Sequence, residues 1–238
     1  MGTTEPKRKR VRRARGSLSR EEILAGAGEL IEQHGLRPLS MPGLARHLGS
    51  GVTSLYWYFR SKDELLVALV EHVTNELCAR LPPVSDRPWD QEFEVYFIAF
   101  REEARRAPVF LELFAHHPRF LFSPPAVART LIRRLEDEKS VLVRAGLSAE
   151  QASQVHSICS TYTGGFVLLE HRLVDEPSKD GADRQIDPLI AGLDPLTSPT
   201  LTQLQSFESA PWLDDAHFRL GLRILIEGIR TEFEALRS

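Results

Sequence analysis

Residues 48–62 read LGSGVTSLYWYFRSK, and this stretch predicts the end of one short helix and the start of another. Gly49 is expected to break the first helix, because glycine readily adopts the backbone conformation of a tight turn. Ser50 is in position to cap the next helix. Leu55 and Phe59 lie four residues apart, so they share one face of that helix and form its apolar anchor.

Polar groups surround this apolar anchor. Thr53 and Ser54 place small side chains at the start of the helix, where they could reach the edges of bases. Tyr56, Trp57 and Tyr58 add hydroxyl and indole donors behind them. A short amphipathic helix with this arrangement suits insertion into the major groove of DNA.

The flanking sequence predicts further helices on both sides of this stretch. Ser19 and Glu22 form a capping-box pattern that opens the first of them. Ser40 can cap a second helix, so residues 40–59 have the pattern of a helix-turn-helix. Ser61 can cap a fourth helix, which begins with acidic residues that suit a helix N-terminus.

Residues 19–81 resemble the N-terminal domain of the TetR family of bacterial transcription repressors. The resemblance rests on an isoleucine–leucine helix and on the segments SMPGLARHLG, LYWYF and SKDELL. It implies two sets of DNA contacts, with bases facing Val52, Thr53 and Ser54, and phosphates facing Tyr56, Tyr58 and Lys62.

Two positions depart from the tetracycline repressors of that family. Pro42 stands where those proteins carry a base-reading arginine, and Gly51 has no side chain. With few bidentate donors, base readout would rest on Val52, Thr53 and the shape of the DNA.

The second helix completes the expected DNA-binding set with Ser40, Arg46 and His47. Arg46 and His47 could touch the DNA backbone, and solvated surface positions are an equally good interpretation of both residues.

Charge is unevenly distributed along the chain. Residues 1–62 hold 12 Lys or Arg against 5 Asp or Glu, while the remainder carries a net charge of −10. Seven of the nine residues from Lys7 to Arg15 are basic, including Arg13 and Arg15. We expect residues 1–18 to form an arm that is disordered without a partner and that contacts DNA phosphates or the minor groove. The alternative is a solvated tail.

The remaining sequence predicts an all-α fold of about ten helices. Helices are expected at residues 90–107, 109–116, 124–145, 149–173, 200–207 and 214–236, with a long loop at 174–198. No strand-like alternation occurs. The expected domains are the arm at 1–18, a DNA-binding domain at 19–81 with its fourth helix as connector, and a C-terminal domain at 89–238.

Two apolar stripes in the C-terminal domain predict a homodimer interface. They lie on helix 149–173 and on the last helix, and comprise Tyr162, Phe166, Leu169, Phe218, Leu222, Leu225, Ile226 and Ile229. Packing within one chain is the alternative. The family resemblance favours a four-helix bundle across a two-fold axis, which would present two recognition helices about one DNA turn apart.

A cluster of aromatic and polar residues predicts a pocket for a small-molecule effector. Its members are Phe93, Tyr96, Phe97, Phe100, Phe110, Phe114, His117, His156, Ser160 and Thr163. The same aromatic residues could instead fill the core.

The segments RAGLSAEQA and TGGFVLLEH resemble the tetracycline-repressor subgroup. That subgroup holds a magnesium–tetracycline chelate with a histidine and a glutamate, where this chain has Phe110 and Leu169. Glu112 and His116 share a helical spacing, but a dedicated metal site needs more ligands. We therefore expect no metal and no cofactor.

The hypothesis from sequence is a cytoplasmic, sequence-specific transcription regulator that a small apolar or aromatic molecule releases from a palindromic operator. Alternatives are an activator, a regulator controlled by a partner protein, an all-α enzyme, or a nonspecific DNA-coating protein. Enzyme activity is not expected, because no catalytic motif occurs. No apolar run is long enough for a membrane span.

Overall fold

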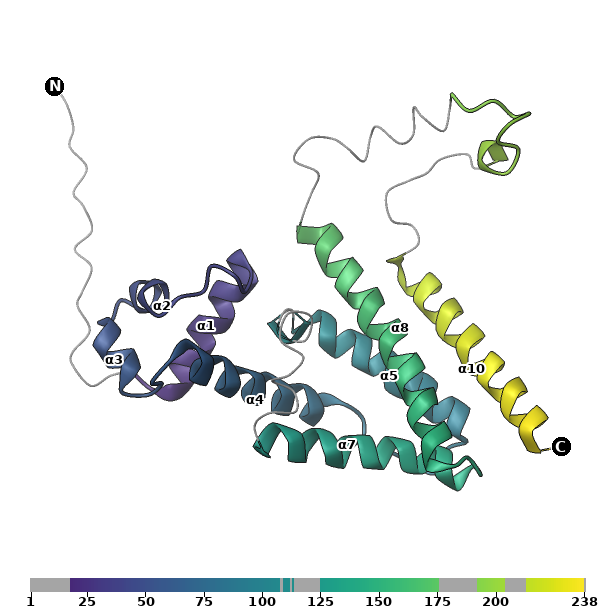
Figure 1. Cartoon of the computed structure of the whole chain (residues 1–238), viewed down its shortest axis with the longest axis horizontal. Helices are drawn as coiled ribbons and strands as arrows, with labels where there is room; N and C mark the ends of the chain where they lie inside the picture. The colour runs from purple at the N-terminus through teal and green to yellow at the C-terminus, as the bar shows by residue number, and fades with distance from the viewer. Residues whose placement is uncertain are drawn as a thin grey trace. The chain divides into compact units, whose positions relative to one another are not determined.

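The computed structural model describes residues 18–107, 109–111, 113, 125–175, 192–203 and 213–237 (Figure 1). All regular secondary structure in these ranges is helical, which confirms the all-α prediction. The elements are α1 (Arg20–His34), α2 (Met41–His47), α3 (Val52–Tyr56), α4 (Lys62–Arg80), α5 (Trp89–Arg105), α7 (Pro125–Arg144), α8 (Ala149–Asp175), η2 (Leu201–Gln203) and α10 (Asp215–Arg237). Residues 109–111 and 113 are also helical.

Some predictions concern residues outside these ranges. The arm with Arg13 and Arg15, most of the loop 174–198, and the pocket candidates Phe114 and His117 lie outside the described residues. Of the helix expected at 200–207, the described residues include the 3₁₀ turn η2. No helix in the described ranges is long and apolar enough to cross a membrane.

The chain divides into two compact units. The first combines the chain up to Arg80 with the segment from Ala107 to Arg134. The second combines Leu81–Arg106 with the chain from Leu135 onward. The described residues 109–111, which follow α5, thus belong to the first unit.

Local hydrogen bonds define the first two helices. The Ser19 hydroxyl accepts from the Glu22 amide at 3.1 Å, and the Glu22 carboxylate accepts from the Ser19 amide at 2.9 Å. This reciprocal pair is the capping box that the sequence predicted. Ser40 caps α2 by accepting from the Gly43 amide at 3.2 Å.

The cap of α3 differs from the prediction. Gly51 is the N-cap, because its extended backbone (φ −82°, ψ 143°) lets its carbonyl accept from the Ser54 amide at 2.9 Å. Ser50 therefore lies one residue too early to cap the helix, and its amide donates to the Ala45 carbonyl instead. Its hydroxyl is buried and has no hydrogen-bond partner.

The short helix α3 is held by its apolar anchor. Leu55 and Phe59 are both completely buried, as the four-residue spacing predicted. Arg20 covers the Phe59 ring at 5.2 Å, which ties the start of α1 to the residue that follows α3. The core around this anchor includes Ile23 and Leu44.

The second unit is built on α5, α8 and α10, which pack against one another in all three pairs (Figure 1). Tyr162 on α8 stacks on Phe218 of α10 with centroids 5.5 Å apart, and its hydroxyl donates to the Phe218 carbonyl at 3.1 Å. A Cβ atom on Gly221 would lie 2.1 Å from that hydroxyl, so this glycine permits the close approach.

Most residues of the predicted dimer stripe are buried within the protomer. The exposed fractions are 9% or less for the five residues Phe166, Phe218, Leu222, Ile226 and Ile229. Phe166 and Phe218 contact each other edge to face at 5.2 Å. The strongest apolar stripe of a helix usually faces the core of its own chain. The sequence of the stripe does not show whether the residues that cover it come from the same chain or from a partner. Tyr162 and Leu225 are half-buried, and Leu169 is exposed.

Replacing Gly221 with alanine tests the close contact between α8 and α10. The added methyl group would displace Tyr162, and such overpacking costs about 1–3 kcal/mol of unfolding free energy. The control is Gly164→Ala, because a Cβ there meets no atom within 4 Å and alanine should stabilise the helix by up to about 1 kcal/mol. Urea denaturation measures both variants, and equal stability of the two would contradict the contact.

Candidate functional site

The outer surface of the helix-turn-helix is formed by α3 and the two residues that follow it. Thr53 is exposed, and Val52 and Ser54 are half-buried. The exposed fraction is 47% for Tyr56 and 85% for Trp57. Leu55 and Phe59 are buried on one face of this turn. The exposed side chains Thr53, Tyr56 and Trp57 lie on its other faces and therefore point outward.

Lys62 and Tyr58 already have partners within the first unit. The Lys62 ammonium donates to the Leu39 carbonyl at 2.6 Å, and its remaining two protons are available for another acceptor. The Tyr58 hydroxyl donates to the Leu18 carbonyl. A hydroxyl has only one proton, so Tyr58 cannot donate to a phosphate while this bond persists.

The remaining predicted residues of α2 lie along one groove of about 400 Å³ between α1 and α2. Its lining residues are Leu30, His34, Pro38, Leu39, Ser40, Gly43, Arg46 and His47. Arg46 is exposed at its edge, and His47 contacts Glu29 of α1 at 2.7 Å. The structure thus brings Ser40, Arg46 and His47 together along this groove.

In the second unit, several predicted pocket residues form one aromatic cluster. The Phe97 ring lies 5.5 Å from Phe93, 4.9 Å from Tyr96 and 5.8 Å from His156. Phe100 stacks on Tyr96 at 6.2 Å and is half-buried. Phe110 is buried and belongs to the first unit.

The polar members of this cluster have unequal hydrogen bonding. His156 is bonded through Nε2 to Glu138 at 2.6 Å and through Nδ1 to Ser160 at 3.3 Å. Thr163 is completely buried, and its hydroxyl has no hydrogen-bond partner among the residues that the structure describes. A buried hydroxyl without a partner costs about 1–3 kcal/mol, so an added acceptor would stabilise Thr163.

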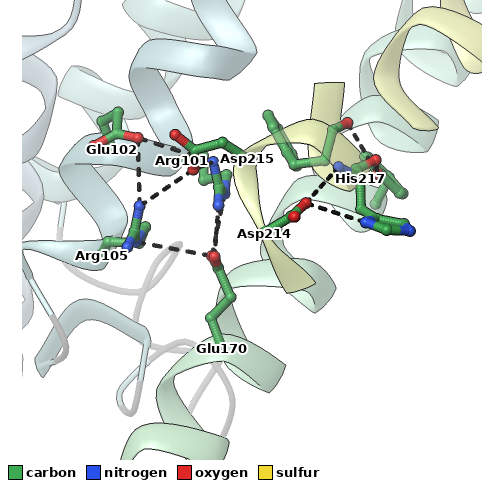
Figure 2. Close-up of polar contacts among 9 residues, drawn as sticks. Arg101, Glu102, Arg105, Glu170, Asp214, Asp215 and His217 are labelled. Carbon is green, nitrogen blue, oxygen red and sulfur yellow. Dashed lines mark hydrogen bonds and ion pairs between the residues drawn. The ribbon is translucent and has the colours of Figure 1, made fainter. Parts of the chain in front are cut away.

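A charge cluster centred on the buried Arg101 joins α5, α8 and α10 (Figure 2). Arg101 is 3% exposed and donates to Glu170 through Nε at 3.1 Å and through Nη2 at 2.5 Å. Its Nη1 donates to Asp215 at 2.7 Å. The guanidinium also lies 5.3 Å from the Phe166 ring and 4.7 Å from the Phe218 ring.

Neighbouring charges extend this cluster, which we call the Arg101 cluster. Arg105 lies 4.0 Å from Glu170, 3.7 Å from Asp215 and 3.5 Å from Glu102 (Figure 2). Burial disfavours the charged guanidinium, but the hydrogen bonds to Glu170 and Asp215 outweigh it, so the pKa of Arg101 is raised. The hydrogen bond from Arg101 lowers the pKa of Asp215.

Arg101 and Glu138 are functional candidates that no motif indicates, although their spacing carries a signal. Arg101 continues the inward stripe of Phe93 and Phe97 at intervals of four residues. Glu138 interrupts the apolar stripe of α7 between Leu135 and Leu142. A charged residue inside an apolar stripe indicates a buried ion pair, because an unpaired charge there would be costly.

The Arg101 cluster predicts a specific pH dependence of stability. The lowered pKa of Asp215 contributes stability above its unfolded value of about 3.9, and that contribution is lost as pH falls through the folded value. Asp215→Asn should therefore destabilise the protein at pH 7 and make less difference near pH 3. Denaturant titrations of both proteins at the two pH values measure this, and a constant difference would contradict it.

The profile "Bacterial regulatory proteins, tetR family" matches residues 23–69, and the profile "Tetracyclin repressor-like, C-terminal domain" matches residues 89–233. The second match covers more than half of the chain. The chain belongs to the TetR family. This membership confirms the resemblance stated from sequence, and the protein is a DNA-binding transcription regulator.

Named relatives agree with this membership. An HTH-type transcriptional repressor of Mycobacterium tuberculosis is 33% identical over 222 residues, which is 92% of this chain and 83% of the relative. The class C tetracycline repressor protein of Escherichia coli is 26% identical over 89% of this chain and 90% of its own length.

Solved structures share the same fold. The TetR-family protein ActR of Streptomyces coelicolor, in complex with actinorhodin, aligns with a TM-score of 0.68 at 23% identity, over 91% of this chain and 99% of ActR. TetR from Acinetobacter baumannii aligns with a TM-score of 0.56 at 26% identity, over 93% and 100% of the two chains.

In the part of the chain that the structure describes, no group of three or more His, Cys, Asp or Glu side chains could hold a metal ion.

Proposed function

We propose that this TetR-family protein is a repressor that a small apolar or aromatic molecule releases from a palindromic operator. The observation that carries the proposal is the outward presentation of Thr53, Tyr56 and Trp57 on the fully buried Leu55–Phe59 anchor. The M. tuberculosis relative is named a repressor, which supports repression as the direction of control. The protein acts in the cytoplasm and by binding, without catalysis.

The DNA contacts follow from the arrangement of the helix-turn-helix. Val52, Thr53 and Ser54 approach bases, while Tyr56 and Lys62 approach phosphates. The groove residues Ser40, Arg46 and His47 and the arm residues Arg13 and Arg15 add contacts to the sugar–phosphate backbone. Arg46 is exposed and the arm is strongly basic, so both can neutralise phosphates.

A second copy of the chain is proposed to cover the outer faces of α8 and α10. Ile158 and Leu169 are 47% and 53% exposed on α8, and Leu220 and Ile224 are 48% and 62% exposed on α10. Gly165 is exposed between Ile158 and Leu169, and Gly228 is exposed one turn after Ile224. A Cβ atom on either glycine would meet nothing within 4 Å. Small residues flanked by exposed apolar ones allow two helices of a partner to approach closely. Two-fold pairing requires a palindromic operator.

Ile224→Asp tests this face without disturbing the core of the protomer. The variant should shift the protein from dimer to monomer in analytical ultracentrifugation, because the charge would be buried in the interface. Ile132→Asp on α7 is the matched control, since Ile132 is also 62% exposed. A dimeric Ile224→Asp variant would place the interface elsewhere. Ile226→Asp is a poorer test, because that side chain is only 6% exposed.

The aromatic cluster of the second unit is the proposed effector site. Phe93, Phe97 and Tyr96 form its buried apolar part, and the buried Thr163 hydroxyl has no hydrogen-bond partner among the described residues. The ActR structure, which contains actinorhodin, supports this kind of site in the shared fold. An effector with a hydrogen-bond acceptor on an aromatic body would satisfy Thr163.

Release from DNA requires that the effector prefer a conformer whose two helix-turn-helix units no longer match the spacing of the half-sites. Effector and operator must then weaken each other's binding by the same factor. A ligand that binds without changing operator affinity would not be the inducer.

Fluorescence anisotropy with the DNA upstream of the protein's own gene tests the regulator itself. Thr53→Val should reduce the preference for operator over scrambled DNA about tenfold, because a base contact is worth about 1–3 kcal/mol. Lys62→Met should instead weaken binding to both DNAs and reduce the salt slope by about one. Equal binding of operator and scrambled DNA by the wild type would contradict a sequence-specific repressor.

A further inference from the structure

A buried imidazole lies inside the aromatic cluster of the second unit. His156 on α8 is 9% exposed, and its ring lies 6.5 Å from the Phe93 ring and 5.8 Å from the Phe97 ring. Its Nε2 atom is bonded to Glu138 of α7 at 2.6 Å, and its Nδ1 atom is bonded to Ser160 of α8 at 3.3 Å. The elements α5, α7 and α8 thus each supply a neighbour of this ring.

The two ring nitrogens lie in different surroundings. The Glu138 side chain is only 3% exposed, so Nε2 is directed into the core. Ser160 is half-buried, so Nδ1 is on the more accessible side of the ring. The bond to Ser160 at 3.3 Å is also longer than an ordinary hydrogen bond of about 2.7–3.2 Å. It is therefore the bond of His156 that a ligand can replace most readily.

Glu138 determines what the ring offers at Nδ1. An ionised carboxylate only accepts hydrogen bonds, so Nε2 must carry a proton to bond it. In the neutral ring Nδ1 is then an acceptor, and a carboxylate partner on the other nitrogen increases its basicity. In the imidazolium form Nδ1 is a donor. A weakly acidic hydroxyl suits both forms, because a phenol donates to the neutral ring and a phenolate accepts from the imidazolium.

The neighbouring rings favour a flat aromatic body for the molecule that carries this hydroxyl. Tyr96 and Phe100 are stacked at 6.2 Å, and Phe97 lies edge to face with Tyr96 at 4.9 Å. Phe100 is half-buried, so part of this aromatic surface is accessible. Aromatic rings pack on one another in these same stacked and edge-to-face arrangements. An aliphatic alcohol has neither the flat body nor the acidity.

We propose that the effector site binds phenols, with the phenolic oxygen taking the place of Ser160 at Nδ1 of His156. Glu138 is the positioning residue that keeps Nε2 protonated and directs Nδ1 toward the ligand. This inference rests on the proposed function, because it names the chemical class of the effector for the same site.

The test uses 4-nitrophenol as the probe and 4-nitroanisole as its matched ether, in which a methyl group replaces the hydroxyl proton. Equilibrium dialysis with the full chain should show about tenfold tighter binding of 4-nitrophenol, because the ether cannot form the hydrogen bond to the ring. Bound 4-nitrophenol should also absorb further to the red than the un-ionised free probe, because the bond to Nδ1 draws the proton away from the phenolic oxygen.

Ser160→Ala removes the group that competes for Nδ1. It should tighten the binding of 4-nitrophenol about threefold and leave the binding of 4-nitroanisole unchanged, whereas a serine with a purely structural role would affect both probes alike. The matched control is Ser157→Ala, because Ser157 is an exposed serine on the same helix. This control should change the binding of neither probe.

Two further variants test the buried pair. Glu138→Gln keeps the size of the side chain but removes its charge, so it should diminish both the red shift and the preference for the phenol. The double variant His156→Phe/Glu138→Leu should bind both probes equally. It removes both partners together, which avoids leaving an unpaired charge in the core. Circular dichroism confirms folding of each variant.

The outcomes separate this inference from the proposed function. Equal binding of the two probes by the wild type, no saturable binding of either, or weaker 4-nitrophenol binding by Ser160→Ala would overturn the inference. Operator binding of the same preparation is measured by fluorescence anisotropy. A preference for operator over scrambled DNA without a preference for the phenol would overturn the phenol site alone. A preference for the phenol with equal binding of both DNAs would support the site and overturn the proposed function.

Discussion

Burial of Leu55 and Phe59 is the constraint on which the DNA-binding surface depends. The helix α3 has only five residues and cannot be stable by itself. Helix nucleation is unfavourable, and a helix this short forms too few backbone hydrogen bonds to offset its cost. Its conformation is imposed by two side chains that are completely inside the core. The same anchor decides which side chains face outward, so the apolar pair and the polar surface are two aspects of one packing arrangement.

The second unit depends on a different interaction. The Arg101 guanidinium is removed from water, and a buried charge of this kind is tolerated only with excellent partners. Glu170 and Asp215 supply them from α8 and α10, and the rings of Phe166 and Phe218 cover the remaining faces. Since the outer faces of these two helices carry Leu169 and Ile224, the geometry of the proposed dimer surface follows from contacts made behind it.

What the sequence could predict was governed by local interactions. The cap at Ser19, the cap at Ser40 and the Leu55–Phe59 anchor each depend on residues within four positions, and the structure contains all of them. The cap of α3 was misplaced by one residue, because the extended backbone of Gly51 performs that role without a side chain.

Longer-range features were not predictable in the same way. Phe218 and Leu222 formed the stripe assigned to a partner chain, but α5 and α8 of the same chain bury them, and no local pattern distinguishes the two situations. The structure places Phe93, Phe97 and His156 near one another, and the Glu138 partner of His156 depends on how α7 meets α8. The Tyr58–Leu18 contact spans 40 positions and involves a backbone atom, so no sequence pattern predicts it.

The separation of the bonded residues also gives the two units different folding times. The Arg101 bonds join residues 69 and 114 positions apart, whereas the Lys62 bond to Leu39 spans 23. Longer loops cost more entropy to close and slow folding. During synthesis, the N-terminal helices can therefore complete their structure while α10 is still being made. The Arg101 guanidinium can pair with Glu170 first, and it gains its bond to Asp215 only after α10 has emerged.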